Sequence, residues 1–119
     1  MDAFDDRSPI YQQIAERIRS AILSGDLKEG DQVMSTTQYA TTHRINPATA
    51  AKAMAVLIDE GLLEKRRGLG MFVEPGARDA LLAAGRATFF ARSLDPALAE
   101  AAALGITTDQ LIDHIKGEK

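Results

Sequence analysis

Isoleucines recur every four residues in the segment 10–22, and this spacing predicts an amphipathic helix near the start of the chain. Ser8 and Pro9 precede the segment as a capping hydroxyl followed by a proline whose missing N–H costs nothing at that position. Gly25 follows, where a left-handed residue is favoured. We therefore expect a first helix that is capped by Ser8 and ends at Gly25, with residues 1–8 forming a loose polar arm before it.

Two shorter helices should follow, because each is preceded by a residue that caps helices well. Ser35 can cap a helix over residues 36–43, and Asn46 followed by Pro47 combines a cap with a proline that starts helices. The third helix has a predicted buried face of four apolar residues, namely Ala50, Met54, Leu57 and Ile58. The segment 32–34, between the first two helices, is expected to form a very short strand.

The apolar period changes from helical to alternating after the third helix. Residues 62–67 and 71–74 predict two strands, and the glycine-rich, basic segment between them predicts a hairpin turn. A proline and a glycine then follow the second strand. They mark the expected boundary between a first domain, residues 1–75, and a second, residues 76–119.

The second domain is rich in alanine and leucine and should be wholly helical. One helix is expected over residues 78–93, and Asp95-Pro96 repeats the cap-then-proline pattern that opens a new helix. Thr107 and Gln110 are three residues apart, as in a capping box, and lead into a last short helix.

Three helices followed by a hairpin is the order of a winged helix-turn-helix, so the expected fold class is mostly α with a small β-hairpin, followed by a C-terminal helical tail. In such a fold the third helix can lie in the major groove of DNA, with the hairpin beside it. The residues expected to approach DNA are Asn46, Ala48, Thr49 and Lys52 on the third helix, and Lys65, Arg66, Arg67, Gly68 and Gly70 at the hairpin. The arginines can pair with phosphates, and the glycines let the backbone approach DNA closely.

The net charge of the 119-residue chain is −3, whereas a DNA-binding surface is usually basic. The positive charges are nonetheless concentrated in the segment that would read DNA. From Arg44, itself a candidate contact, to Val73 there are five Lys or Arg against three Asp or Glu. The acidic balance leaves one alternative open, a winged helix used only for protein–protein contact.

The composition argues against several other classes of function. The chain has no cysteine, which removes disulfides, zinc–thiolate sites and thiol catalysis. His43 and His114 are its two histidines, and the local sequence suggests no nucleophile–base pair and no Asp/His cluster at metal-ligand spacing, so we expect no enzyme, metal site or cofactor. Without a long apolar run or a secretion signal, the chain is expected to be soluble and cytoplasmic, with no membrane contact.

Several segments between Ser8 and Val73 resemble the GntR family of bacterial regulators. They are Pro9-Ile10-Tyr11-Gln12-Gln13-Ile14, Ile22-Leu23-Ser24-Gly25-Asp26-Leu27, Gly30-Asp31, Gly61-Leu62-Leu63-Glu64 and Arg67-Gly68-Leu69-Gly70-Met71-Phe72-Val73. The total length, the Ile45-Asn46-Pro47-Ala48-Thr49 segment and the Ala103-Leu104-Gly105-Ile106 segment are similar to the YtrA-type branch, which has a short tail.

The resemblance implies a DNA-binding transcription regulator, by default a repressor, in which Ser35, Thr36 and Thr37 begin the second helix near a phosphate. The chain also departs from the family. Most members have an arginine where this chain has Thr37, while Ala48 and Ala51 stand at positions that are commonly basic or bulky. Fewer charged contacts imply a shallower salt dependence, since each phosphate contact contributes roughly 0.9 to the slope of log K against log salt.

The tail carries more apolar residues than a short appendage can bury alone. We expect a homodimer whose interface is formed by Leu81, Leu82, Gly85, Phe89, Leu94, Leu98, Ala101, Ala102, Leu111, Ile112 and Ile115. A two-fold dimer would present its recognition helices to half-sites roughly 34–36 Å apart, so a palindromic operator is expected. Two alternatives stay open: the tail packs on the first helix of its own subunit, or an unknown small-molecule effector binds between Phe89, Phe90 and the dimer seam.

Overall fold

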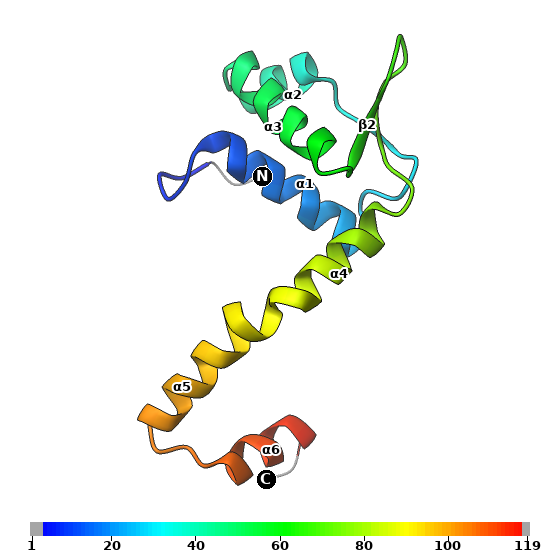
Figure 1. Cartoon of the computed structure of the whole chain (residues 1–119). Coiled ribbons are helices and arrows are strands. Elements are labelled where there is room, and N and C mark those ends of the chain that lie inside the picture. Colours follow the sequence, from blue (N-terminus) through cyan, green and yellow to red (C-terminus); the bar gives the residue numbers. More distant parts are fainter. Residues whose placement is uncertain (1–3, 118–119) are drawn as a thin grey trace. The chain divides into compact units, whose positions relative to one another are not determined.

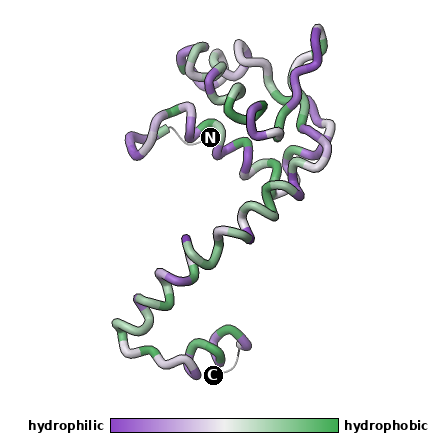
Figure 2. Tube along the Cα trace, viewed as in Figure 1, coloured by the Kyte–Doolittle hydropathy of each residue, from purple (hydrophilic) through white to green (hydrophobic). Residues whose placement is uncertain are grey.

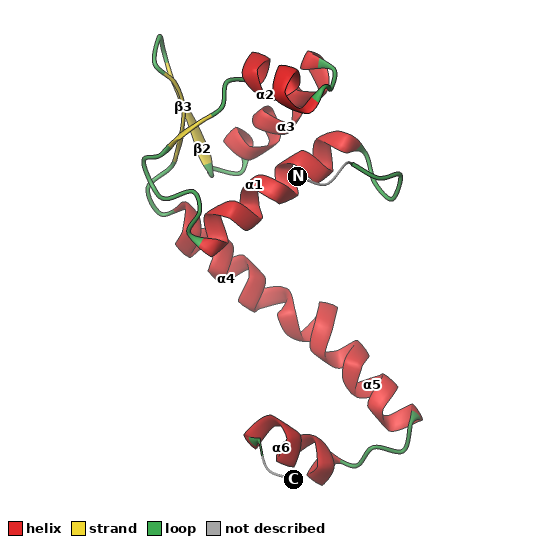
Figure 3. Cartoon of the chain, turned by 180° about the vertical axis from the view of Figure 1, so that it is seen from behind, coloured by secondary structure: helices red, strands yellow, loops and turns green. Residues whose placement is uncertain are grey.

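The computed structural model describes residues 4–117. The chain divides into two units, of which the first ends at Leu82 and the second begins at Ala83. The helices and strands of the first unit are α1 (Ile10–Ser24), β1 (Gln32–Val33), α2 (Thr36–His43), α3 (Pro47–Asp59), β2 (Leu63–Arg66), β3 (Gly70–Val73) and the start of α4 (Ala77–Phe89). Those of the second unit are the end of α4, a π-helical turn η1 (Phe90–Leu94), α5 (Asp95–Ala103) and α6 (Thr108–Lys116). The predicted fold class, mostly α with a small β-hairpin, is confirmed (Figures 1 and 3).

The core of the first unit is built where α3 packs against both α1 and α2. The predicted isoleucine face of α1 is confirmed from Ile14 to Ile22, and Figure 2 shows hydrophobic stretches in both α1 and α3. Ile10 does not belong to it, because the first position of the helix lies beyond the core and its side chain is 40% exposed. The buried face of α3 consists of Ala50, Ala53, Met54 and Leu57. The prediction for Ile58 was wrong, since its side chain is 37% exposed. Ala53 is buried instead. Positions 50, 53, 54 and 57 lie on the side of α3 that faces α1 and α2, and position 58 lies outside that side.

The hairpin predicted after α3 is confirmed as part of a three-stranded antiparallel sheet of order β1-β3-β2. Leu63 pairs with Val73 and Arg66 with Gly70, so the hairpin turn lies at the far end of these strands. The very short strand β1 pairs with the outer edge of β3. Gln32 of this strand donates from Nε2 to the carbonyl of Leu69 at 3.0 Å.

Gly70 is the position in the sheet whose backbone conformation favours glycine. Its φ of +111° is unfavourable for other residues, and a Cβ there would lie 2.7 Å from the Gln32 amide nitrogen. The Gln32 amide occupies the space beside this glycine, where it bonds the carbonyl of Leu69.

Two of the predicted helix starts in the first unit are confirmed by their capping bonds. The Ser35 hydroxyl accepts from the backbone N–H of Gln38 at 3.1 Å, and the Gln38 side chain accepts from the N–H of Ser35 at 3.1 Å. The Asn46 side chain accepts from the N–H of Ala48 at 2.8 Å, and Pro47 follows as the first helical residue.

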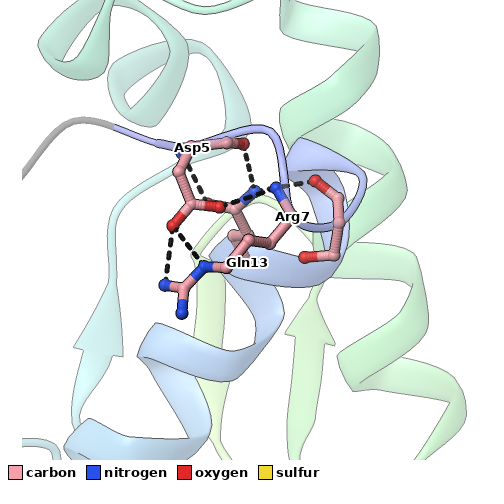
Figure 4. A network of polar contacts seen from close by, with 4 residues as sticks. Asp5, Arg7 and Gln13 are labelled. Carbon is pink, nitrogen blue, oxygen red and sulfur yellow. Dashed lines mark hydrogen bonds and ion pairs between the residues drawn. The ribbon is translucent and has the colours of Figure 1, made fainter.

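Ser8 was wrongly predicted to cap α1, and the arm before it is held in place rather than loose over its described residues. The N-cap is Pro9, without a side-chain bond. Gln13 instead donates to the carbonyls of Asp5 and Ser8, both at 2.7 Å, and accepts from the N–H of Asp5 (Figure 4). The Gln13 amide therefore bonds the backbone carbonyls of the turn that leads into α1. Residues 1–3 of the predicted arm lie outside the described residues.

Further contacts hold the same arm. Arg7 forms an ion pair with Asp5 at 2.7 Å, and this hydrogen bond lowers the pKa of the Asp5 carboxyl. Phe4 packs against the core of the first unit, with the Arg17 guanidinium carbon 4.0 Å from its ring centroid. Its ring also meets that of His43 edge-on at 6.4 Å, so the arm touches the end of α2.

The start of α4 belongs to the first unit. Ala77 is buried there, and Leu81 packs against the core cluster. The guanidinium Nε of Arg78 donates to the carbonyl of Leu23 at 3.0 Å, and the N–H of Gly76 donates to Glu29 at 2.9 Å. These contacts join the first turns of α4 to the end of α1 and to the loop that follows it.

The helix α5 begins at Asp95 with Pro96 in its first turn, as predicted, but Asp95 does not cap it and the backbone stays helical before it. Leu94 and Asp95 keep helical backbone angles, so the end of α4, η1 and α5 form one helical run. Pro96 has no N–H to donate one turn back, and its ring crowds the carbonyl there. The π-helical turn precedes it, where the N–H of Asp95 reaches the carbonyl of Phe90, and a widened turn of this kind relieves such crowding.

The last helix begins as predicted. The Thr107 hydroxyl accepts from the N–H of Gln110 at 3.1 Å, and the Gln110 side chain accepts from the N–H of Thr107 at 2.8 Å. Over residues 4–117, no helix has the length and apolar character needed to cross a membrane.

We expect Leu57→Ala to lower the free energy of unfolding by about 2–5 kcal/mol, because it leaves a cavity between the three helices. Ile58→Ala is the matched control on the same helix, with an expected decrease of about 1 kcal/mol or less because that side chain is partly exposed. Urea denaturation followed by circular dichroism measures both. Equal decreases would contradict the burial of Leu57 and exposure of Ile58.

Candidate nucleic-acid interface

A hollow of about 400 Å³ lies between the first turn of α2, the outer side of α3 and the hairpin, here called the wing. It brings together candidate residues that are far apart in the sequence: Ser35, Thr36 and Thr37 from α2, and Lys65 and Gly70 from the wing. Its apolar wall consists of Ala51, Met54, Ala55, Ile58 and Met71. The exposure of Ile58 is explained by this position, since its side chain faces the hollow.

The turn between α2 and α3 places Arg44 at an exposed corner. Arg44 adopts a left-handed conformation, with φ +54° and ψ +51°, and ends α2 in the manner usual for glycine. The N–H of Ile45 returns to the carbonyl of Ala40 at 3.0 Å and closes the turn. The side chain of Arg44 is thereby presented immediately before the start of α3.

The candidate residues of α3 differ in how they are presented. Asn46 uses its side-chain oxygen as a cap, which leaves the amide NH₂ able to donate. Ala48 is exposed and Thr49 is half-buried. Lys52 is exposed but directed toward α1, with its Nζ atom 4.1 Å from the ring centroid of Tyr11. Lys52 therefore stands beside the hollow rather than in its wall.

The wing carries its three cations in two different settings. Lys65 and Arg67 are exposed, and Gly68 adopts a φ of +77° in the turn that the N–H of Leu69 closes with the carbonyl of Arg66 at 2.9 Å. Arg66 is more confined. Its Nε atom donates to Glu64 at 2.7 Å, and its guanidinium carbon lies 4.3 Å from the ring centroid of Phe72.

Two carboxyl groups share the outer face of the wing with Arg66. A hydrogen bond with Glu74 lowers the pKa of Glu64, and the bond from Arg66 lowers it further. The interaction with Glu64 raises the pKa of Glu74. Of the two carboxyl groups, Glu64 is the one that pairs directly with the Arg66 guanidinium.

Three residues near these groups were not predicted from the sequence. Tyr11 and Phe72 have their rings against Lys52 and Arg66, contacts that join different elements and leave no local pattern. Leu69 is 65% exposed at the wing turn. The sequence does contain a signal for Leu69, because an apolar side chain stands between two glycines in a turn where a polar residue is usual.

The residues predicted for the dimer interface fall into two groups. Leu81 and Leu82 are half-buried in the first unit, where Leu81 packs on the core. For Leu81, packing within one subunit accounts for its apolar character. In the second unit Ala101 is buried and Leu94 and Leu111 are half-buried, while the remaining candidates are exposed, namely Gly85, Phe89, Leu98, Ala102, Ile112 and Ile115.

Comparison with known proteins gives a family match over the winged helix-turn-helix. The model for bacterial regulatory proteins of the gntR family matches residues 10–73, from the first residue of α1 to the last of β3. The chain is 33% identical over 118 residues to the HTH-type transcriptional repressor YtrA of Bacillus subtilis, covering 98% of this chain and 90% of the relative. It is 35% identical over 66 residues to the mannosyl-D-glycerate system repressor MngR of Escherichia coli, and there covers only 28% of the relative.

Solved structures agree with this family. A GntR family transcriptional regulator from Listeria monocytogenes is similar with a TM-score of 0.72 and 27% identity, over 98% of this chain and 100% of that one. The DNA-binding domain of AraR in complex with operator ORX1 is similar with a TM-score of 0.55 and 27% identity, over 59% of this chain and 90% of that one. The chain is thus a DNA-binding transcription regulator rather than an enzyme, resembles YtrA along nearly its whole length, and belongs to the GntR family of bacterial regulatory proteins.

Proposed function

We propose that this regulator is a cytoplasmic repressor that binds a palindromic operator as a homodimer. Residues 1–75 read the DNA, and residues 76–119 join the two subunits. The observation that carries the proposal is the hollow that gathers the first turn of α2, the outer side of α3 and the wing on one surface. That surface contains the three elements with which a winged helix contacts DNA.

In this proposal α3 enters the major groove by its N-terminal half. The methyl group of Ala48 can contact the methyl group of a thymine, and the hydroxyl of Thr49 can hydrogen-bond to a base edge. Lys52 and Arg44 contact phosphates on either side of the groove. The first turn of α2, with Ser35, Thr36 and Thr37, lies against the backbone, where its side-chain hydroxyls donate to phosphate oxygens.

The wing supplies the remaining contacts. Lys65, Arg66 and Arg67 pair with phosphates, and the turn glycines Gly68 and Gly70 let the backbone approach. Few cations contribute in all, which agrees with the formal net charge of −3. Binding should therefore depend less steeply on salt than in relatives with more basic surfaces.

The second unit supports the homodimer. Phe89, Leu98 and Ile115 are 49%, 42% and 80% exposed within one chain, which is unusual for large apolar side chains in so small a unit. Burial against a second copy removes them from water. The relatives named as repressors, YtrA and MngR, support repression.

We expect the double substitution Arg66→Ala and Arg67→Ala to weaken binding to the DNA upstream of the regulator's own operon. The slope of log K against log salt should flatten by about 0.9 for each phosphate that is no longer neutralised. Fluorescence anisotropy between about 50 and 200 mM salt measures affinity and slope together.

Lys28→Ala is the matched control for charge, because Lys28 lies in the exposed loop after α1, at the end of β3 away from the wing turn. It should leave the slope unchanged. If the wild-type chain fails to bind this DNA even at the lowest salt, the alternative of a winged helix for protein–protein contact is favoured.

We expect Ile115→Asp to shift the protein from dimer to monomer at micromolar concentration, because a carboxylate buried in an apolar interface is strongly unfavourable. Sedimentation equilibrium gives the oligomeric state. Ile115→Leu, which keeps the apolar character, is the control and should stay dimeric. A wild-type protein that sediments as a monomer at this concentration would refute the homodimer.

A further inference from the structure

Two of the cations proposed to contact DNA lie on aromatic rings of the same chain. The Nζ atom of Lys52 lies 4.1 Å from the ring centroid of Tyr11, which belongs to α1. The guanidinium carbon of Arg66 lies 4.3 Å from the ring centroid of Phe72, on the neighbouring strand. Both distances are within the range of an attractive cation–π contact.

We propose that Tyr11 and Phe72 are positioning residues for DNA binding, each holding one cation in the orientation in which it meets a phosphate. The inference rests on the proposed DNA-contacting roles of Lys52 and Arg66. The rings themselves contact no DNA in this proposal, and they act only by placing the charges beside them.

For Lys52 the ring restricts a side chain that would otherwise move freely. A lysine has four rotatable bonds, and binding a phosphate normally fixes them at a cost in entropy. Tyr11 is partly buried against the core, so the ring has a defined place that does not depend on its hydroxyl. Lys52 itself remains exposed, and its ammonium group still has N–H donors directed away from the ring.

For Arg66 the ring and a carboxylate act from different sides. Phe72 supports the face of the guanidinium, and Glu64 accepts from Nε at 2.7 Å. The terminal nitrogens, which form the bidentate pair with a phosphate, are not used by the Glu64 bond. The strand register favours the contact, because Arg66 pairs with Gly70, which has no side chain to separate it from Phe72.

The inference accounts for how an acidic chain can bind DNA with few contacts. The chain has 14 Lys or Arg against 17 Asp or Glu, so it cannot depend on a broad positive surface. A cation that is already oriented gives up less freedom on binding, and more of its interaction with the phosphate appears as affinity.

Double-mutant cycles on the full-length chain test the proposal, with duplex DNA from upstream of its own operon as the probe. Tyr11→Leu should weaken binding about two- to fivefold, the size expected for one exposed cation–π contact. It should leave the salt slope unchanged, because Lys52 still reaches its phosphate. In a Lys52→Ala background, the same change should have no further effect.

The second cycle has the same design. Phe72→Leu should weaken binding by a similar factor, and the effect should vanish in an Arg66→Ala background. The conservative variants Tyr11→Phe and Phe72→Tyr keep an aromatic ring and should restore wild-type affinity. Melting temperatures of all variants show whether a weaker affinity comes from unfolding.

Proton NMR of the free protein supplies a measurement that does not depend on any variant. The Lys52 methylene protons next to the ammonium should be shifted upfield by the Tyr11 ring, and ordinary shifts would overturn the proposal for this pair. Additive effects in the cycles, or a Tyr11→Phe variant as weak as Tyr11→Leu, would overturn it as well while leaving DNA binding established. Failure of the wild-type chain to bind DNA would overturn the proposed function and this inference together.

Discussion

The packing of α3 against α1 and α2 determines which residues of the first unit can meet a ligand. Leu57 and Met54 fix the helix about its own axis, since they fill the space between its two neighbours. With that rotation fixed, Ala51 and Ile58 must face the hollow beside the wing, and Lys52 must face the edge of α1. The reading surface is therefore a consequence of the core, and a change in the core would turn every group on it.

The outer face of the wing carries few charges together with groups that orient them. Glu64 is the clearest case, because its negative charge beside Arg66 reduces the local positive potential and at the same time fixes the guanidinium. In the proposed DNA-bound state, Glu64 would fix the direction of the guanidinium at some cost in attraction to phosphate.

The sequence predicted those features that depend on neighbouring residues. The caps at Ser35, Asn46 and Thr107 each need only a side chain and an N–H two or three positions away, so their signals are local. The change of apolar period predicted the hairpin and the order of elements. The short sequence motifs predicted the family. Ser8 failed as a cap because the helix begins one residue later: Pro9 is the N-cap, and its carbonyl accepts from the N–H groups of Gln12 and Gln13.

What the sequence could not show depends on contacts between distant segments. The hollow, the strand pair β1–β3 and the two cation–ring contacts join residues brought together only by the fold. The π-helical turn is a different case, because Pro96 is compatible both with the start of a helix and with a widened turn inside one. The geometry of the preceding residues decides between them, and Leu94 is already helical.

Because the DNA-contacting surface has few cations, the proposed dimer would be needed for tight binding. One winged helix with so few phosphate contacts would leave a single half-site quickly. When two are linked, the second binds at a high effective concentration, and the two affinities combine without any new contact. Exposed apolar residues of the tail, such as Phe89 and Ile115, would thus contribute to DNA affinity although they lie in a different unit from the DNA-contacting groups.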